Sequence, residues 1–156
     1  MALDRTDRRL LSALQLDGRM SVVELAESVG LSPTPCARRI RQLEQSGVIE
    51  GYAVLVNPVK LGLRVQAFVQ VKLVRHHDDQ VEQFSRALDG IEQVVGGYAT
   101  TGEYDFILHV VAADLDSLSN VVLKRLLRIP AVRDVHSSIV LETVKRSVRV
   151  PIAALD

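Results

Sequence analysis

The sequence is 156 residues long, 47% of them hydrophobic and 24% charged, and its formal net charge is zero. This length fits one medium domain or two small ones with their own hydrophobic cores. A single cysteine excludes a disulfide framework within the chain. The sequence shows no signal-peptide pattern and no hydrophobic run near the roughly 20 residues of a membrane span, which predicts a cytoplasmic protein without a membrane partner.

The first thirty residues predict two capped helices. The first begins after an Asp4 N-cap and buries one stripe, formed by Leu10, Leu11 and Leu14. The second begins after Ser21, because Glu24 stands three residues later and completes a capping box. Gly30 supplies the left-handed residue of a tight turn.

A third helix starts almost at once, after a Ser32 N-cap. Pro33 and Pro35 fall in its first turn, where backbone N–H groups have no intrahelical partner, so they stiffen the start of the helix without breaking it. Gly47 ends it in a Schellman-type stop, and Val48 to Tyr52 is expected as a short strand. This order is typical of a winged helix-turn-helix.

The outer surface of this third helix indicates DNA. Its inward stripe is Cys36, Ile40 and Leu43, which makes Cys36 a structural thiol, whereas polar and arginine side chains face out: Thr34, Pro35, Arg38, Arg39, Arg41, Gln42 and Gln45. A first turn of short polar residues suits base edges, and guanidinium groups suit phosphates. The alternative is an ordinary amphipathic helix with solvated arginines, and the balance of seven arginines and seven carboxylates in the first fifty residues favours it.

A second unit follows a connecting segment at residues 53–63, which Asn57-Pro58 and Gly62 mark as a turn region. Its first strand is expected at Val65 to Leu73, where hydrophobic residues alternate with others. A helix follows, capped by Asp78 or Asp79 and ending at Gly90, and then a strand from Val94 to Thr101. A turn at Gly102 to Tyr104 leads into a strand from Asp105 to Ala112. The last two elements are a helix capped by Asp114 or Asp116 and ending before Pro130, and a strand from Val135 to Val144.

This βαββαβ order predicts a ferredoxin-like antiparallel sheet with both helices on one face. The fold class is therefore α+β, with a winged helix-turn-helix at residues 1–52, a connecting strand and linker at 53–63 and a βαββαβ domain at 64–156. The uncovered sheet face is unusually hydrophobic, through Phe68, Val95, Ile107, Val111 and Val140, and His109 and His136 alternate onto the same side. Such a face predicts that two copies of the chain pair as a homodimer.

Other chemical candidates are weaker. His76 and His77 precede two aspartates and could hold a metal, but without a spaced set of partner ligands a solvated loop is favoured and no metal site is predicted. No nucleophile–base spacing, phosphate-cradling glycine loop or paired carboxylate motif occurs. We therefore expect neither an enzyme nor a cofactor.

Several segments together resemble the Lrp/AsnC (leucine- and asparagine-responsive, feast/famine) family of transcriptional regulators. They are Leu3 to Asp17, LSPTPCARRIRQLEQSGVIEGY from Leu31 to Tyr52, the following NPVKLG, and TGEYDF from Thr101 to Phe106. The resemblance covers nearly the whole chain. It implies an N-terminal DNA-binding domain, a C-terminal ligand-sensing domain similar to ACT domains, dimers that commonly assemble into octamers, and amino-acid effectors.

Carried onto this chain, the resemblance places candidate DNA contacts and a candidate effector loop. The DNA contacts are Ser21, Ser32, Thr34, Pro35, Arg38, Arg39 and Gln42, with Arg39 expected to clamp a phosphate. The effector loop is Thr100, Thr101, Gly102, Glu103, Tyr104 and Asp105. Asp105 could accept the ammonium of an amino acid, and backbone N–H groups around Gly102 could bind its carboxylate. The alternative is a tight hairpin in which Gly102 takes a positive φ and Asp105 accepts backbone hydrogen bonds.

The expected function is therefore a sequence-specific DNA-binding transcriptional regulator modulated by a small effector, an amino acid. Two alternatives remain open: an amino-acid-binding regulatory subunit of an enzyme, and a DNA-organising protein that responds to no effector. The enzyme subunit would not bind duplex DNA, whereas the expected regulator would. The DNA-organising protein would bind DNA without responding to any amino acid.

Overall fold

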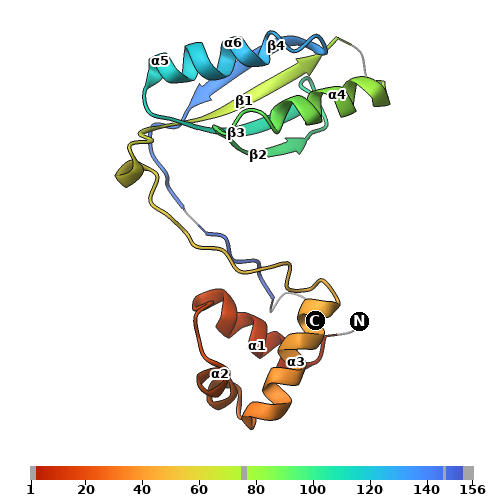
Figure 1. Cartoon of the computed structure of the whole chain (residues 1–156), viewed down its shortest axis with the longest axis vertical. Coiled ribbons are helices and arrows are strands. Elements are labelled where there is room, and N and C mark those ends of the chain that lie inside the picture. The colour runs from red at the N-terminus through yellow and green to blue at the C-terminus, as the bar shows by residue number, and fades with distance from the viewer. Residues whose placement is uncertain (1–2, 75–76, 146, 153–156) are drawn as a thin grey trace. The chain divides into compact units, whose positions relative to one another are not determined.

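The computed structural model describes residues 3–74, 77–145 and 147–152, which form two compact units (Figure 1). The helical unit contains the chain up to Leu55 together with the segment from Lys145 onward, and the sheet unit contains Val56–Val144. Each unit has its own hydrophobic cluster and is described by itself.

The helical unit consists of α1 (Arg5–Leu16), α2 (Val22–Val29) and α3 (Pro33–Gln45). Their inward stripes meet in a core of Leu10, Leu25, Ala26, Val29 and Cys36. Asp4 and Ser21 cap α1 and α2 through capping boxes with Asp7 and Glu24, and Gly30 takes a left-handed φ of 75°. The three predicted helices and these caps are confirmed.

Ser32 stands at the N-cap of α3, but its side chain accepts no capping hydrogen bond. The third helical residue is Pro35, which has no N–H to donate, so the usual capping partner is missing. The same substitution at two serines should therefore have different effects.

Ser21→Ala is expected to lower the free energy of unfolding by about 1 kcal/mol, because it removes a hydroxyl that bonds both the Glu24 N–H and the Glu24 carboxylate. Ser32→Ala is the matched control and should cost less than about 0.5 kcal/mol. Urea unfolding of the three proteins measures both values. Equal losses at the two serines would contradict the assignment of the caps.

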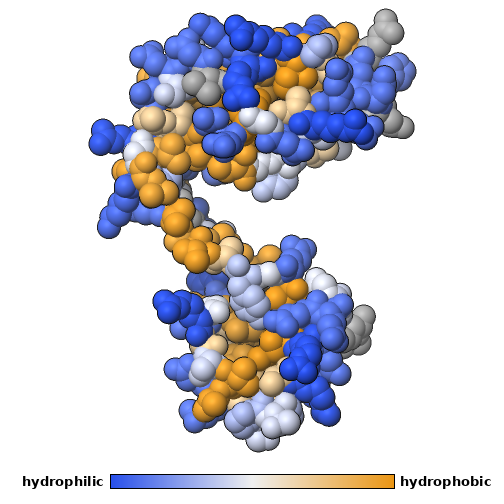
Figure 2. Space-filling model, viewed as in Figure 1, coloured by the Kyte–Doolittle hydropathy of each residue, from blue (hydrophilic) through white to orange (hydrophobic). Residues whose placement is uncertain are grey.

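The end of α3 differs from expectation. The N–H groups of Val48 and Ile49 both donate to the Leu43 carbonyl, at 3.0 and 3.1 Å, and Gly47 has a φ of 72°. This is the predicted Schellman stop. The predicted strand at 48–52 is wrong, because the stop uses the first two N–H groups and the structure assigns no strand to these residues. The following hydrophobic residues Val54, Leu55 and Val56 are exposed (Figure 2).

The C-terminal segment completes the core of the helical unit. Ile152 is buried in a cluster with Leu11 and Leu43. The Gln15 amide exchanges two hydrogen bonds with the backbone of Val150: the Val150 N–H donates to Oε1 at 2.7 Å, and Nε2 donates to the Val150 carbonyl at 3.2 Å. The sequence placed all residues from 64 onward in the second domain, whereas the structure groups the segment from Lys145 with the first unit.

The sheet unit has a four-stranded antiparallel sheet in the order β2-β3-β1-β4. The strands are β1 (Val65–Leu73), β2 (Val94–Ala99), β3 (Phe106–Ala112) and β4 (Val132–Ile139), and a short 3₁₀ turn, η1 (Val59–Leu61), precedes them. Helix α4 (Asp78–Leu88) and a second helical stretch, made of α5 (Leu115–Ser117), the π-helical η2 (Leu118–Leu123) and α6 (Lys124–Leu126), cover one face (Figure 1). The ferredoxin-like fold is confirmed.

Several element boundaries differ from the sequence prediction, and the third strand, for example, begins at Phe106 rather than Asp105. The last strand is Val132–Ile139, not Val135 to Val144, because its pairing with β1 begins where Val132 meets Leu73. The second strand ends at Ala99 rather than Thr101. His77, not an aspartate, is the N-cap of α4, which places Asp79 in the first turn, where a negative charge complements the helix dipole.

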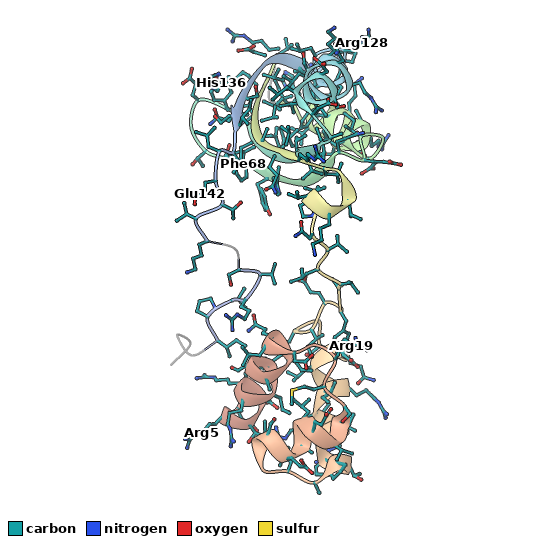
Figure 3. All side chains as sticks on the ribbon, turned by 90° about the vertical axis from the view of Figure 1, so that its left-hand side faces the viewer. Arg5, Arg19, Phe68, Arg128, His136 and Glu142 are labelled. Carbon is teal, nitrogen blue, oxygen red and sulfur yellow. The ribbon has the colours of Figure 1, made fainter. Side chains whose placement is uncertain are left out.

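The other sheet face carries no helix among the residues described. Cross-strand pairing places Phe68, Ile107, His109 and His136 on this side, and Figure 3 shows Phe68 and His136 away from the helices. The Phe68 and His109 rings stack with centroids 5.2 Å apart. We call this side the open face. Val111 shares it but is already buried within the chain, so its predicted contribution to an exposed patch is wrong.

Candidate DNA interface and effector loop

The predicted recognition surface lies on the exposed side of α3. Ser32, Thr34, Arg38 and Gln42 are exposed, and Pro35 is half-buried. Cys36 and Leu43 are buried on the opposite side, and burial raises the pKa of the Cys36 thiol. A raised thiol pKa leaves little thiolate at neutral pH, which agrees with a structural cysteine.

Arg39 is occupied within the protein. Its Nη1 atom lies 2.7 Å from Asp4 Oδ2 and 2.7 Å from Asp7 Oδ1, so it joins α3 to the first turn of α1. The Arg39 and Asp7 side chains are 29% and 11% exposed. The sequence assigned this arginine to a DNA phosphate and missed its two acidic partners. In the sequence analysis Asp4 had only a capping role and Asp7 was not named.

Hydrogen bonding also fixes the charge of the two capping boxes. The Asp7 backbone N–H, followed by Arg39, holds the pKa of Asp4 below 3.8, and the Ser21 hydroxyl lowers the pKa of Glu24. A carboxylate whose folded pKa is lowered stabilises the fold above its usual pKa, and this contribution disappears as the pH falls through the folded value. The contributions of Asp4 and Glu24 are therefore present at neutral pH and are lost in acid.

The predicted effector loop is a tight connection between β2 and β3. Gly102 has a φ of 117°, the Thr100 N–H donates to the Asp105 carbonyl at 2.9 Å, and the Thr100 hydroxyl donates to the Tyr104 carbonyl at 3.0 Å. In contrast, the N–H groups of residues 101–104 make no hydrogen bond to any residue that the structure describes. Four successive backbone donors are thus available to an anion.

The Asp105 side chain is buried against β1 rather than exposed beside the available N–H groups of the loop. The residue is 7% exposed, its Oδ2 accepts the Leu73 N–H at 2.7 Å, and its own N–H donates to the Val71 carbonyl at 2.9 Å. This geometry agrees with the hairpin alternative for Asp105 rather than with an ammonium acceptor. Lys72, which the sequence analysis did not single out, lies with Nζ 3.7 Å from Asp105 Oδ1 and also donates to the Glu103 carbonyl.

Within the described part of the chain, no group of three or more His, Cys, Asp and Glu side chains could hold a metal ion, and His76 lies outside that part. Residues 3–74, 77–145 and 147–152 include no helix long and apolar enough to cross a membrane.

Two family models match this chain, one over the helices that carry the predicted recognition surface and one over the sheet unit that carries the predicted effector loop. The model of the Lrp/AsnC ligand binding domain matches residues 66–150, and a winged helix-turn-helix DNA-binding model matches residues 3–50. The chain belongs to the Lrp/AsnC family. The leucine-responsive regulatory proteins of Escherichia coli and Salmonella typhimurium are each 41% identical to it over 150 residues, which is 96% of this chain and 92% of theirs.

Two solved structures are similar to this chain over nearly its whole length. A transcriptional regulator of Neisseria meningitidis in complex with L-methionine is similar with a TM-score of 0.93 and 39% identity, covering 99% of both chains. The feast or famine regulatory protein of M. tuberculosis complexed with L-methionine is similar with a TM-score of 0.85 and 34% identity, covering 95% of this chain and 98% of that one.

This membership confirms several predictions. The chain is a DNA-binding transcriptional regulator with an amino-acid ligand-binding domain, and the Lrp/AsnC family consists of regulators rather than enzymes. The residues that contact DNA or ligand and the number of subunits remain predictions.

Proposed function

We propose that this Lrp/AsnC protein binds specific duplex operators through the first turn of α3 and changes its operator affinity when a free amino acid occupies the loop at residues 100–105. The exposed row Ser32, Thr34, Arg38 and Gln42 carries the proposal, because it follows a capped helix and a tight Gly30 turn. The leucine-responsive relatives are bacterial proteins, and because a bacterial chromosome lies in the cytoplasm, we expect this regulator to act there.

The exposed row divides into two roles. Ser32 and Thr34 occupy the first turn, the part of a recognition helix that meets base edges, whereas Arg38 lies one turn further along and can bind a guanine or a phosphate. Arg39 is assigned a positioning role instead, because both of its acidic partners lie within the protein. Ser21 remains a candidate phosphate contact at the start of α2, beside its capping bonds to Glu24.

The effector loop offers complementary groups to a free amino acid. The N–H groups of residues 101–104 suit the carboxylate, and the exposed Glu103 carboxylate suits the ammonium in place of buried Asp105. Relatives have been solved with L-methionine and others are named leucine-responsive, so these two amino acids are the first candidates.

The open face supports a homodimer. Phe68 is 42% exposed and stacks on His109 at the centre of a helix-free sheet surface, and such a surface is usually covered by a partner. A two-fold axis through this face would present two copies of α3 to a palindromic operator. Assembly of these dimers into octamers follows the resemblance to the family.

Selection of duplexes from a random library, followed by titration of the selected operator with and without each amino acid, tests the function. We expect operator affinity at least about a thousandfold above that for random duplex. One or more amino acids should change it by about fivefold or more. Absence of a selected sequence would contradict the DNA-binding proposal. Selection without any amino-acid response would instead indicate a DNA-organising protein.

Thr34→Ala and Arg38→Ala are each expected to weaken operator binding by about 1–3 kcal/mol and to relax sequence preference at one position. Gln45→Ala is the matched control, because Gln45 is also exposed but ends α3, far from its first turn. Gel shifts on the selected operator and on single-base variants measure the effect. Unchanged affinity in both variants would remove this helix surface from the interface.

A further inference from the structure

Lys72 reaches from β1 across to the effector loop. Its Nζ atom donates to the Glu103 carbonyl and lies 3.7 Å from Asp105 Oδ1. We propose that Lys72 is a positioning residue that sets the ligand-binding conformation of this loop. The inference rests on the proposed function, because it concerns how the same loop receives an amino acid.

The charge of Lys72 first stabilises the anchor of the loop. Asp105 has a side chain only 6% exposed, and Lys72 supplies a cation to it while remaining 28% exposed itself. A buried carboxylate is stable when paired with a cation and hydrogen-bonded. The Leu73 N–H also donates to Asp105 Oδ2 at 2.7 Å, so the Asp105 side chain ties the end of the loop to β1.

The second contact orients a backbone donor. A trans peptide is planar, so its C=O and the following N–H point in opposite directions. Because Lys72 holds the Glu103 carbonyl toward itself, the Tyr104 N–H faces away from Lys72. That N–H is one of the four donors that the loop offers to a carboxylate. Loss of Lys72 would leave this peptide free to turn.

The neighbouring strand does not explain the position of Lys72. Its cross-strand partner on β4 is Asp134, an exposed carboxylate that would be the ordinary choice for an ion pair on a sheet. Asp134 instead accepts the N–H of Val135 at 2.9 Å. Lys72 therefore turns toward the loop, where one ammonium serves a carboxylate and a carbonyl at once.

Calorimetric titration of the full chain with L-methionine and L-leucine tests the proposal. The reference is the amino acid that the unchanged protein binds. Lys72→Met should lower the affinity for this amino acid by about tenfold or more. Lys72→Arg keeps the charge and should recover most of the lost affinity. Lys60→Met, an exposed lysine outside the loop, is the matched control. Operator affinity without amino acid should be unchanged in all variants, a separation that general destabilisation would not produce.

Ligand affinity in Lys72→Met equal to that of the unchanged protein would overturn the inference, as would an equal loss of operator affinity without ligand. If the unchanged protein binds neither amino acid, the proposed effector role fails and hydrogen exchange still tests Lys72. Amide exchange of Thr100 and Asp105, whose N–H groups are hydrogen-bonded, should then be faster in Lys72→Met than in Lys60→Met, and identical exchange would overturn the proposal.

Discussion

Arg39→Ala is expected to lower the free energy of unfolding of the helical unit by about 2–3 kcal/mol. The substitution leaves Asp7, with a side chain only 11% exposed, without its cation and separates α3 from the first turn of α1. Breaking a fully buried ion pair typically costs about 3–5 kcal/mol, and the partial exposure of Arg39 and Asp4 reduces this figure. Urea unfolding measures the loss.

Arg38→Ala is the matched control, because Arg38 is the neighbouring arginine but is exposed, and it should change stability by less than about 0.5 kcal/mol. Salt dependence separates the two possible roles of Arg39. A lost phosphate contact lowers the slope of log affinity against log salt by about one, whereas a positioning role leaves the slope unchanged. Unchanged stability together with a reduced slope would restore the phosphate contact and contradict the positioning role.

Phe68→Glu is expected to dissociate the proposed dimer, raising its dissociation constant by about a thousandfold or more. The variant introduces a carboxylate at the hydrophobic centre of the open face, where a two-fold axis would bring two copies of it close together. Operator affinity should fall by about a hundredfold or more, because each helical unit then binds its half-site alone.

Analytical ultracentrifugation at micromolar concentration measures the assembly. Leu127→Glu is the control, since Leu127 is 50% exposed, comparable with 42% for Phe68, but follows α6 on the helical side of the sheet. The control should keep the mass of the unchanged protein. A monomeric unchanged protein, or a Phe68→Glu variant of unaltered mass, would contradict the interface.

Local signals in the sequence predicted most of the fold. The spacing of Ser21 and Glu24, the two-residue alternation of Val65 to Leu73 and the position of Gly102 each reflect interactions within a few residues along the chain. The last strand was placed wrongly because its limits depend on pairing with β1, whose paired residues lie 59 to 72 positions away in sequence. Residues 48–52 looked like a strand because they are hydrophobic, but the helix stop uses their first N–H groups.

The sequence also predicted the local features of the candidate site but not its contacts between distant residues. The exposed row on α3 and the loop at 100–105 follow from helical periodicity and turn preference. The partners of Arg39, Asp105 and Lys72 do not, because each contact joins residues more than thirty positions apart. Arg39 and Asp105 were assigned to ligands from the sequence, and the structure gives each of them partners within the protein.

Ile152 packs against Leu11 and Leu43, so the DNA-binding unit is discontinuous in sequence. The core of Leu10, Leu25, Ala26, Val29 and Cys36 lies within the first forty residues, whereas the cluster of Leu11, Leu43 and Ile152 closes only after the C-terminal segment has been synthesised. Chimeras that exchange only the first fifty residues between relatives would pair each helix bundle with a foreign C-terminal segment. Exchange of the helical unit with all of its native packing therefore means transplanting both ends of the polypeptide together.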